Sequence, residues 1–329
     1  MRRIAGVSLC ALLVTVCAAP VSLSDGTRAK DRTGAVAGTR VKTAPVAAAR
    51  DGDGCLPEGG ARSARPGDRA DLGHDEVVAM LADLRQTLTA RFGTSDEHRL
   101  DSMLRRARPI TVPVRFHVVH SGSRGRLSKA AAQRQIATLN AAYGGKKGGA
   151  DTRVRFRLTG FDRTNKPSWF HHPRKYEGAM KKRLRKGGRA TLNVFTAAVG
   201  TDVLGFATFP HQYRKEPRLD GVTIDYRSLP GGPLKEFDRG YTAVHEIGHW
   251  LGLLHTFEDG CLPPGDGVRD TPYEAMPAEG CPDFRDTCPQ RGDDPVHNFM
   301  DYAHDACMRE FTAGQGRRIR AAWAAYRGR

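Results

Sequence analysis

Apolar residues between residues 110 and 226 recur at every second position in several short segments. This two-residue period, combined with many β-branched side chains, is typical of strands that bury one face. The clearest example is the segment ITVPVRFHVVH at 110–120. We expect strands at 110–120, 154–161, 190–196, 204–209 and 221–226.

Other segments show the 3.6-residue period of amphipathic helices. In 128–143, Ala132, Ile136 and Leu139 fall on one face, and Ser128 is a favourable N-cap. Strands and helices alternate along this part of the chain, which predicts a mixed sheet with helices packed on it. We expect further helices at 75–91, 96–106, 176–186, 239–254 and 311–326.

The N-terminal part of the chain has a different composition. Residues 1–24 begin with Arg2 and Arg3 and continue as an apolar run too short to span a bilayer, which predicts a secretory signal peptide. Residues 25–72 have few large apolar side chains, so we expect them to be disordered. No later stretch of the sequence is long and apolar enough for a transmembrane helix.

The positive charge of the chain is concentrated in its middle. Residues 109–240 contain 26 Lys and Arg against 9 Asp and Glu, whereas residues 241–329 contain 9 against 14. A basic region of this kind suits nucleic acid or an anionic cell surface. No nucleic-acid-binding motif accompanies the charge, so a solvated basic face is the favoured interpretation and no nucleic-acid partner is expected.

Beyond residue 255 the periodicity fades, and Gly, Pro, Asp and Cys dominate up to about residue 305. We therefore expect a loop-rich half that needs cross-links. Its four cysteines, which allow three disulfide pairings, are Cys261, Cys281, Cys288 and Cys307. A secreted protein favours disulfides. A second zinc site is the alternative, but none of these cysteines has the C-x-x-C spacing.

The segment HEIGHWLGLLH at 245–255 carries the clearest chemistry. On a helix, His245 and His249 lie one turn apart, so both imidazoles project from one face and can bind zinc. Gly252 suits the end of that helix, after which the chain can return His255 as a third ligand. Glu246 is placed to take a proton from a water at the metal. Three protein ligands leave a position open, which is typical of catalytic zinc.

This H-E-x-x-H-x-x-G-x-x-H pattern resembles the metzincin signature. The segment NFMDY at 298–302 is similar to the metzincin Met-turn. The segments HEIGHWLGLLHTF, GDGVRDTP, DTCP and FTAGQ resemble the pappalysin branch in particular. The resemblance is dense from about residue 238 to 315 and weaker from 112 to 226.

The resemblance implies an α+β fold: a mixed twisted sheet with helices in the N-terminal subdomain, a loop-rich disulfide-linked C-terminal subdomain, and a zinc cleft between them. It implies that Met300 lies beneath the histidines and that Tyr302 donates a hydrogen bond to the oxyanion of the reaction. It also implies the disulfides Cys261–Cys288 and Cys281–Cys307. The catalytic domain is then 109–329, preceded by a prosegment and leader at 25–108.

Oxygen-bearing groups cluster in the glycine-rich loop that follows the zinc motif. Asp266, Asp270, Thr271 and the carbonyl of Val268 are suitable calcium ligands, and pappalysin-like enzymes bind calcium in this region. A polar turn without a metal is the alternative interpretation, because the spacing is not that of an EF-hand.

Two further residues have candidate roles. A Cys55 thiolate could occupy the fourth position of zinc and keep a zymogen inactive, or Cys55 could be an incidental thiol. Asp305 could pair with an Arg or Lys that follows the scissile bond, or it could cap a turn. An enzyme that cuts before Arg could process its own leader at Arg62, Arg65 or Arg69.

The sequence thus predicts a secreted, monomeric zinc endopeptidase that acts on proteins or peptides. The segment 204–209 is expected to form the edge of the sheet, where an extended substrate can add as an antiparallel strand. The alternative is an inactive zinc-containing binding or adhesion module on the same scaffold, against which the intact Glu246 argues. A surface-anchored nucleic-acid-binding protein is a third interpretation.

Overall fold

The computed structural model describes residues 70–104, 108–200 and 203–328. The expected signal peptide, most of the expected leader, and Cys55 lie outside the described residues. None of the helices in the described part of the chain combines the length and the apolar character needed to cross a membrane.

The described chain is built around a five-stranded sheet with the strand order β2-β1-β3-β5-β4. Its strands are β1 (Ile110–His120), β2 (Val154–Asn165), β3 (Leu192–Ala197), β4 (Gly205–Ala207) and β5 (Val222–Asp225). Four strands pair in parallel, and β4 pairs with β5 antiparallel at the edge. The predicted strands and the predicted edge position of 204–209 are confirmed.

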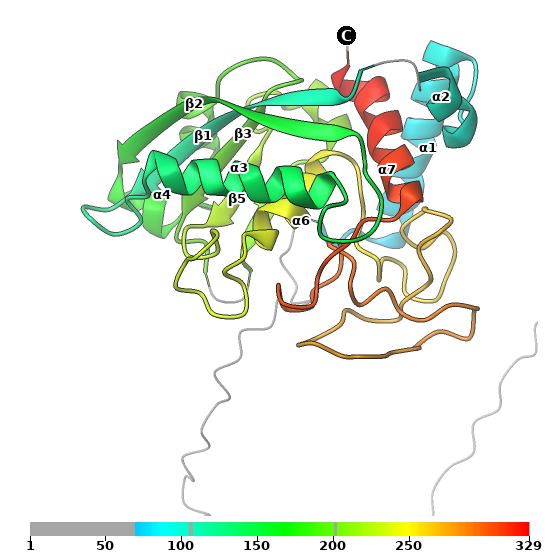
Figure 1. The fold of residues 1–329 in the computed structure, drawn as a ribbon. Coiled ribbons are helices and arrows are strands. Elements are labelled where there is room, and N and C mark those ends of the chain that lie inside the picture. The colour runs from blue at the N-terminus through cyan, green and yellow to red at the C-terminus, as the bar shows by residue number, and fades with distance from the viewer. Residues whose placement is uncertain (1–69, 105–107, 201–202, 329) are drawn as a thin grey trace, which may run out of the picture. The chain divides into compact units, whose positions relative to one another are not determined.

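Helices cover both faces of the sheet (Figure 1). On one face lie α3 (Lys129–Tyr143) and α6 (Tyr241–Trp250), which share a core with alternate residues of β1 and β3 such as Val118 and Val194. The other face carries α4 (Pro167–His171) and α5 (Glu177–Leu184), which pack on Val119 and Phe195. Neighbouring residues of one strand point to opposite faces, so each strand contributes to both cores.

Helix α3 holds α6 in place through two polar contacts inside the apolar core. The Tyr143 hydroxyl donates to the carbonyl of Val244 at 2.9 Å, and the Gln135 amide donates to the carbonyl of Gly240 at 2.9 Å. The predicted N-cap of α3 is confirmed, because Ser128 accepts a hydrogen bond from the N–H of Ala131 at 3.1 Å. The sheet thereby positions α6 through α3.

Between α6 and α7 (Ala313–Ala322) the chain has no further helix or strand, as the fading periodicity predicts. A short π-helix, η2 (Trp323–Arg327), follows α7, and a 3₁₀-helix, η1 (Pro210–Arg214), follows β4. The C-terminal half contains the disulfides Cys261–Cys288 and Cys281–Cys307, which is the pairing implied by the family resemblance. The mixed α+β architecture expected from the sequence is confirmed.

Two helices precede the sheet, namely α1 (His74–Phe92) and α2 (Glu97–Leu104). Figure 1 shows them beside α7, and their leucines share an apolar cluster with alanines of α7 and η2. Arg318 and Arg320 of α7 form ion pairs with Glu97 and Asp101 of α2 at 2.5 and 2.6 Å. This part of the expected leader is therefore packed against the C-terminal helix.

Candidate active site

Helix α6 is buried along its whole length and carries two of the three motif histidines. The carboxylate of Asp305 lies at the N-terminus of α6, where it accepts hydrogen bonds from the N–H groups of Arg239 and Tyr241 at 2.9 and 3.3 Å. Negative charge is favourable at a helix N-terminus, where N–H groups lack partners within the helix. Asp305 is 1% exposed, so its position matches the capping interpretation.

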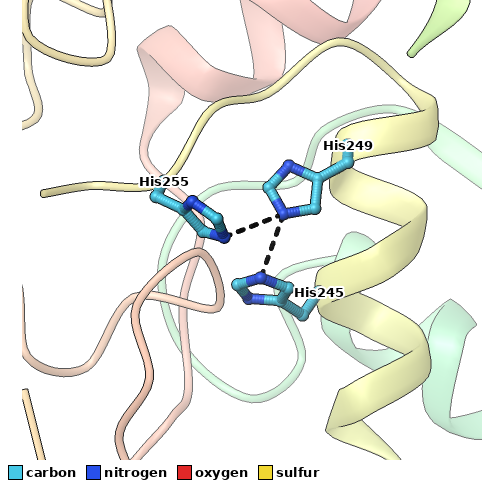
Figure 2. Close-up of side chains that lie close together, drawn as sticks. All are labelled: His245, His249 and His255. Carbon is cyan, nitrogen blue, oxygen red and sulfur yellow. Dashed lines mark hydrogen bonds between the residues drawn. The ribbon is translucent and has the colours of Figure 1, made fainter. Parts of the chain in front are cut away.

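The three motif histidines converge, as Figure 2 shows. The Nε2 atom of His249 lies 3.0 Å from that of His245 and 3.2 Å from that of His255. The Nδ1 atoms of His245 and His249 contact the carbonyl oxygens of Phe299 and Leu253 at 2.8 and 2.9 Å. A carbonyl can only accept, so each Nδ1 carries the proton and each Nε2 presents a lone pair.

These donors suit a zinc ion. Tetrahedral zinc with Zn–N bonds of about 2.0–2.1 Å places its nitrogen ligands roughly 3.3 Å apart. The two short Nε2–Nε2 separations lie close to this value, and the three ligand atoms all lie within 4.8 Å of one another. Among the described residues, this is the one group of three or more His, Cys, Asp or Glu side chains so arranged. Lone pairs facing each other without a proton between them are stabilised by a cation.

A sharp turn after α6 brings the third histidine back. Gly252 has φ +98°, a conformation that L side chains rarely adopt, and its N–H donates to the carbonyl of His249 at 2.9 Å. The expected helix 239–254 therefore ends at Trp250, and His255 lies on the chain that follows. Because this chain also carries Leu253, the turn supplies both a ligand and the acceptor for His249.

Met300 lies directly beneath the zinc-motif helix and is completely buried. A Cβ atom added at Gly248 would come within 2.3 Å of the Met300 sulfur, so only a glycine leaves room for this side chain. The Met300 carbonyl accepts a hydrogen bond from the N–H of Thr256 at 3.2 Å, which ties this turn to the residue after His255. Met300 therefore contacts both α6 and the chain that follows His255, whereas its role as a base beneath the histidines stays a prediction.

The other two motif side chains lie beside the histidines. A Cβ atom added at Gly205 of β4 would come within 2.6 Å of the Glu246 carboxylate, so the edge strand passes closely over it. The Tyr302 hydroxyl lies 3.1 Å from Nε2 of His255. The structure thus brings together three candidate metal ligands, an acid–base candidate and a phenol from three separate stretches of chain.

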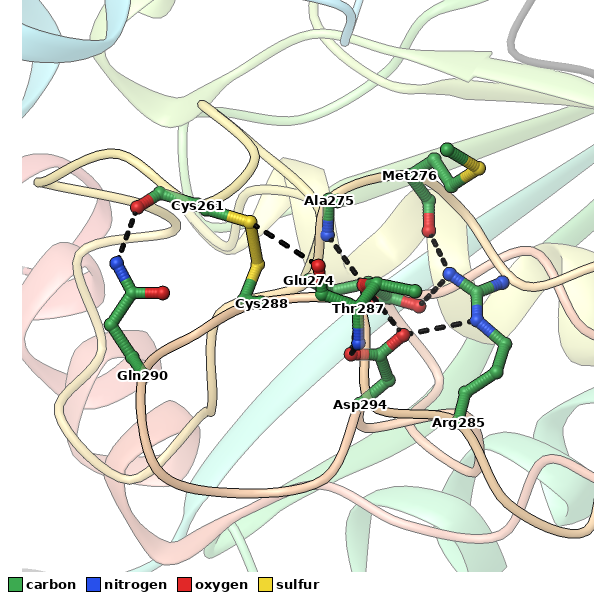
Figure 3. The surroundings of a disulfide bond; sticks show 9 residues. All are labelled: Cys261, Glu274, Ala275, Met276, Arg285, Thr287, Cys288, Gln290 and Asp294. Carbon is green, nitrogen blue, oxygen red and sulfur yellow. Dashed lines mark hydrogen bonds and ion pairs between the residues drawn. A yellow bond between two sulfur atoms is a disulfide. The ribbon is translucent and has the colours of Figure 1, made fainter.

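The loop-rich half is joined to the third histidine by a buried polar network. Thr256 donates to Glu274 at 2.8 Å, and Arg285 lies 3.4 Å from Glu274 and 3.0 Å from Asp294. Figure 3 shows that Asp294 and Thr287 connect this network to the disulfide Cys261–Cys288. Burial and the Asp301 carboxylate raise the pKa of Glu274 to about 9. The segment after His255 is therefore fixed by many contacts.

Three of the four residues expected to bind calcium, Asp266, Val268 and Thr271, are joined by hydrogen bonds in one turn. Asp266 is buried and accepts a hydrogen bond from the N–H of Val268 at 2.9 Å, and the main-chain N–H of Thr271 donates to the carbonyl of Val268 at 3.3 Å. Burial raises the pKa of Asp266 to about 7. Asp270 instead accepts from Thr312 and from the N–H of Gly314 at 2.8 and 2.7 Å, at the start of α7.

Several residues of the site were missed by the sequence reasoning. Gly205 and Gly248 make room for Glu246 and Met300, and the carbonyls of Phe299 and Leu253 orient the histidines. Main-chain carbonyls leave no trace in a sequence. The glycine at 248 does lie inside a helical motif, where glycine is unfavourable and therefore a signal of close packing.

Comparison with known proteins agrees with this geometry. Residues 191–324 match the model of peptidase family M43, described as pregnancy-associated plasma protein-A. An extracellular metalloprotease of Colletotrichum graminicola is 45% identical over 230 residues, which are 68% of this chain and 80% of that protein. One from Arthroderma benhamiae is 39% identical over 224 residues, which are 66% of this chain and 74% of that protein.

Solved structures give the same result. Mature mirolysin of Tannerella forsythia, in complex with a cleaved peptide, is 31% identical with a TM-score of 0.58, covering 65% of this chain and 91% of mirolysin. The fold and the site define a metzincin-type metalloprotease. Within that class, the chain belongs to the pappalysin family.

Proposed function

We propose that this protein is a secreted zinc-dependent endopeptidase. The observation that carries the proposal is the convergence of the Nε2 atoms of His245, His249 and His255. Secretion is supported by the signal-like N-terminus and by relatives that are named extracellular metalloproteases. The proposed substrates are proteins or peptides, and the proposed active form is a monomer.

In this proposal His245, His249 and His255 hold the zinc. When bound, the metal supplies Lewis acidity and lowers the pKa of a water molecule to near neutrality. Glu246 accepts the proton of the attacking water and passes it to the leaving amine. The Tyr302 hydroxyl, 3.1 Å from His255, donates a hydrogen bond to the oxygen of the attacked carbonyl as its negative charge develops.

Strand β4 is the proposed docking edge for the substrate. It is the last strand of the sheet, and its Gly205 approaches the Glu246 carboxylate. An extended peptide that pairs with this edge as an antiparallel strand would bring its scissile bond to Glu246. Main-chain pairing of this kind accepts many sequences, so side-chain preference must come from other parts of the site.

The test is casein and peptide-library cleavage by the purified protein, with Glu246→Gln and Glu246→Ala as variants. We expect both variants to bind zinc and keep the wild-type melting temperature while losing cleavage by several orders of magnitude. Cleavage that survives in Glu246→Gln would contradict the role of Glu246. A folded wild-type protein that binds zinc but cleaves nothing would favour the alternative, an inactive zinc-containing adhesion module.

We also propose that the Asp266 loop binds calcium for stability. The buried, main-chain-bonded carboxylate of Asp266 next to the Val268 carbonyl and Thr271 supports it, whereas Asp270 is engaged at α7. A ligand that binds only the folded protein raises its melting temperature. If calcium leaves the melting temperature of wild type and Asp266→Asn equally unchanged, the loop is a polar turn.

We further propose that Cys55 keeps the newly made protein inactive, and that the enzyme prefers Arg or Lys after the scissile bond. If Cys55 is the inhibitor, Cys55→Ala should shorten the delay before the full-length protein becomes active, with Glu246→Ala as the control for self-processing. The preference would need Asp305 to act on the substrate, although its carboxylate is bonded to the start of α6. Unchanged library specificity in a folded Asp305→Asn variant would assign Asp305 to capping alone.

A further inference from the structure

The first described residues of the chain lie on the segment that carries the third zinc ligand. The N–H of Leu72 donates to Glu258 at 3.3 Å, and His74 Nδ1 lies 3.2 Å from the Asp259 carboxylate. Nδ1 of His255 itself lies 3.7 Å from Asp71. Three residues within a stretch of four thus contact the short segment 255–259.

Apolar packing reinforces these polar contacts. A buried apolar cluster joins the start of this segment to the rest of the protein. It contains Phe209 and Leu254 together with Ala70, Val77, Met80 and Leu81. Leu254 immediately precedes His255. The ring of Phe209 packs edge-on against the ring of His249, with 5.5 Å between their centroids. The start of α1 therefore supports the surroundings of two zinc ligands.

The rest of this N-terminal segment is anchored at several separate points. Asp83 of α1 accepts a hydrogen bond from Tyr326 of η2 at 2.7 Å, and Arg91 donates to the carbonyl of Ala325 at 2.7 Å. Helix α2 forms the two ion pairs with α7 described above. Contacts at both ends of the segment 70–104 would all be lost if it were released as part of a propeptide.

We propose that Asp71, Leu72 and His74 are positioning residues for His255, and that the segment 70–104 stays in the active protease. Activation cleavage would then fall before Ala70, at or near Arg62, Arg65 or Arg69, and not at the expected domain boundary near residue 108. The physical reason is that groups behind a metal ligand fix its orientation, and their loss commonly costs metal affinity. This inference rests on the proposed zinc protease function.

The first experiment follows self-processing of the full-length chain, with Glu246→Ala as the inactive control. We expect N-terminal sequencing of the active product to find a start between about residue 55 and Ala70, absent from the control. A fully active product that starts after Leu104 would overturn the proposal. A chain that neither processes itself nor cleaves casein would instead contradict the proposed function, so the two failures are distinguishable.

The second experiment measures zinc affinity by chelator competition in full-length variants. Asp71→Ala combined with His74→Ala, and separately Glu258→Ala, should weaken zinc binding about tenfold to a hundredfold. Glu258→Gln keeps an acceptor for the N–H of Leu72 and should restore most of the affinity. The matched control is Asp83→Ala. This substitution also lies in α1, but it removes the hydrogen bond with Tyr326 of η2 and no contact with the described segment 255–259.

Zinc affinity is the readout that separates positioning from general stability. Asp83→Ala should lower the melting temperature while leaving zinc affinity within about twofold of wild type. If the double variant and Asp83→Ala have equal zinc affinities, the N-terminal segment does not position His255 and the proposal fails. If Glu258→Ala does not fold, the proposal is judged from the zinc affinity of the Asp71→Ala, His74→Ala double variant, because both of its substitutions lie outside the zinc motif.

Discussion

Gly248, the glycine between the two histidines of α6, shows how tightly the site is packed at the scale of single residues. Alanine normally stabilises a helix relative to glycine by roughly 0.5–1 kcal/mol. At this position the added Cβ would come within 2.3 Å of the Met300 sulfur. We therefore predict that Gly248→Ala lowers the free energy of unfolding by about 1–3 kcal/mol, as overpacking does, measured by denaturant titration.

The matched control is Gly178, a glycine of α5 where an added Cβ would meet only a Leu219 methyl group at 4.0 Å. Gly178→Ala should be neutral or stabilising. If both variants change stability in the same direction and to the same extent, packing of Met300 against Gly248 does not explain the effect of Gly248→Ala. A Gly248→Ala, Met300→Ala double variant should recover part of the loss, because it removes the clashing sulfur.

Glu274 supplies a second prediction at this scale, concerning pH. Its pKa is raised from 4.5 to about 9, mainly by burial and then by Asp301, although Arg285 lies 3.4 Å away and opposes the shift. The folded state thus holds the proton more tightly than the unfolded state. The stability it contributes is fully present below about pH 4.5 and is lost progressively as the pH rises towards 9.

Glu274→Gln cannot ionise but can still accept the hydrogen bond from Thr256. Relative to wild type, this variant should gain stability on the order of 1–3 kcal/mol between about pH 5 and pH 8. The measurement is the melting temperature of both proteins across that range in one buffer series. Parallel curves for the two proteins would show that Glu274 is ionised in the folded state.

At the scale of elements, the strands and long helices could be predicted because each repeats a local pattern. The alternation in 110–120 reproduces β1 to the residue, and the apolar face of 128–143 reproduces α3. Helix α4 was missed because its five residues are too few to show a period. The end of α6 was placed four residues late, because apolar residues continue past Trp250 while Gly252 turns the chain.

The C-terminal π-helix η2 gives a further prediction, because its buried Arg327 contacts the last residue of α6. Arg327 of η2 is 1% exposed and donates to Asp220 at 2.9 Å and to the carbonyl of Trp250 at 3.0 Å. Its guanidinium also lies 3.6 Å from the Trp250 ring centre. Without Arg327, the buried Asp220 would keep the indole N–H of Trp250 at 3.0 Å and the longer contact with Arg185 at 3.5 Å, and breaking a buried pair typically costs about 3–5 kcal/mol.

We therefore predict that Arg327→Met lowers the unfolding free energy by about 3–5 kcal/mol in chemical denaturation. The control is Arg214→Met, which removes the exposed ion pair with Asp83 and should cost no more than about 1 kcal/mol. Restoring apolar contact by Asp220→Leu together with Arg327→Met should recover part of the loss. Equal effects of the two single variants would contradict the buried-pair argument.

At the scale of the whole molecule, the sequence could predict that the three histidines converge, because they lie within one eleven-residue motif. Some of their contacts are local, such as that of His249 with the carbonyl of Leu253, but others are distant in sequence: Phe299 is 54 residues from His245, and Leu72 is 186 residues from Glu258, which follows His255 by three positions. Such contacts depend on how the chain folds back on itself and have no local pattern. The packed position of the segment 70–104 was missed for the same reason.

The final prediction follows from this long-range arrangement. The proposed zinc is held by α6 and by the loop that follows it, and its ligands contact the Met-turn and the segment before α1. Zinc should therefore stabilise the whole described fold and not the motif alone. At free zinc of 100 times its dissociation constant, the gain is about 2.7 kcal/mol, which is roughly 5–10 °C in melting temperature.

Differential scanning calorimetry with selective chelators tests this coupling. A transition-metal chelator such as phenanthroline should lower the melting temperature as one cooperative transition, and added zinc should restore it. His255→Ala should melt at the chelated temperature and respond little to either treatment, whereas a calcium chelator should act independently through the Asp266 loop. A wild-type protein that loses activity but keeps its melting temperature in phenanthroline would show that the metal is not coupled to folding.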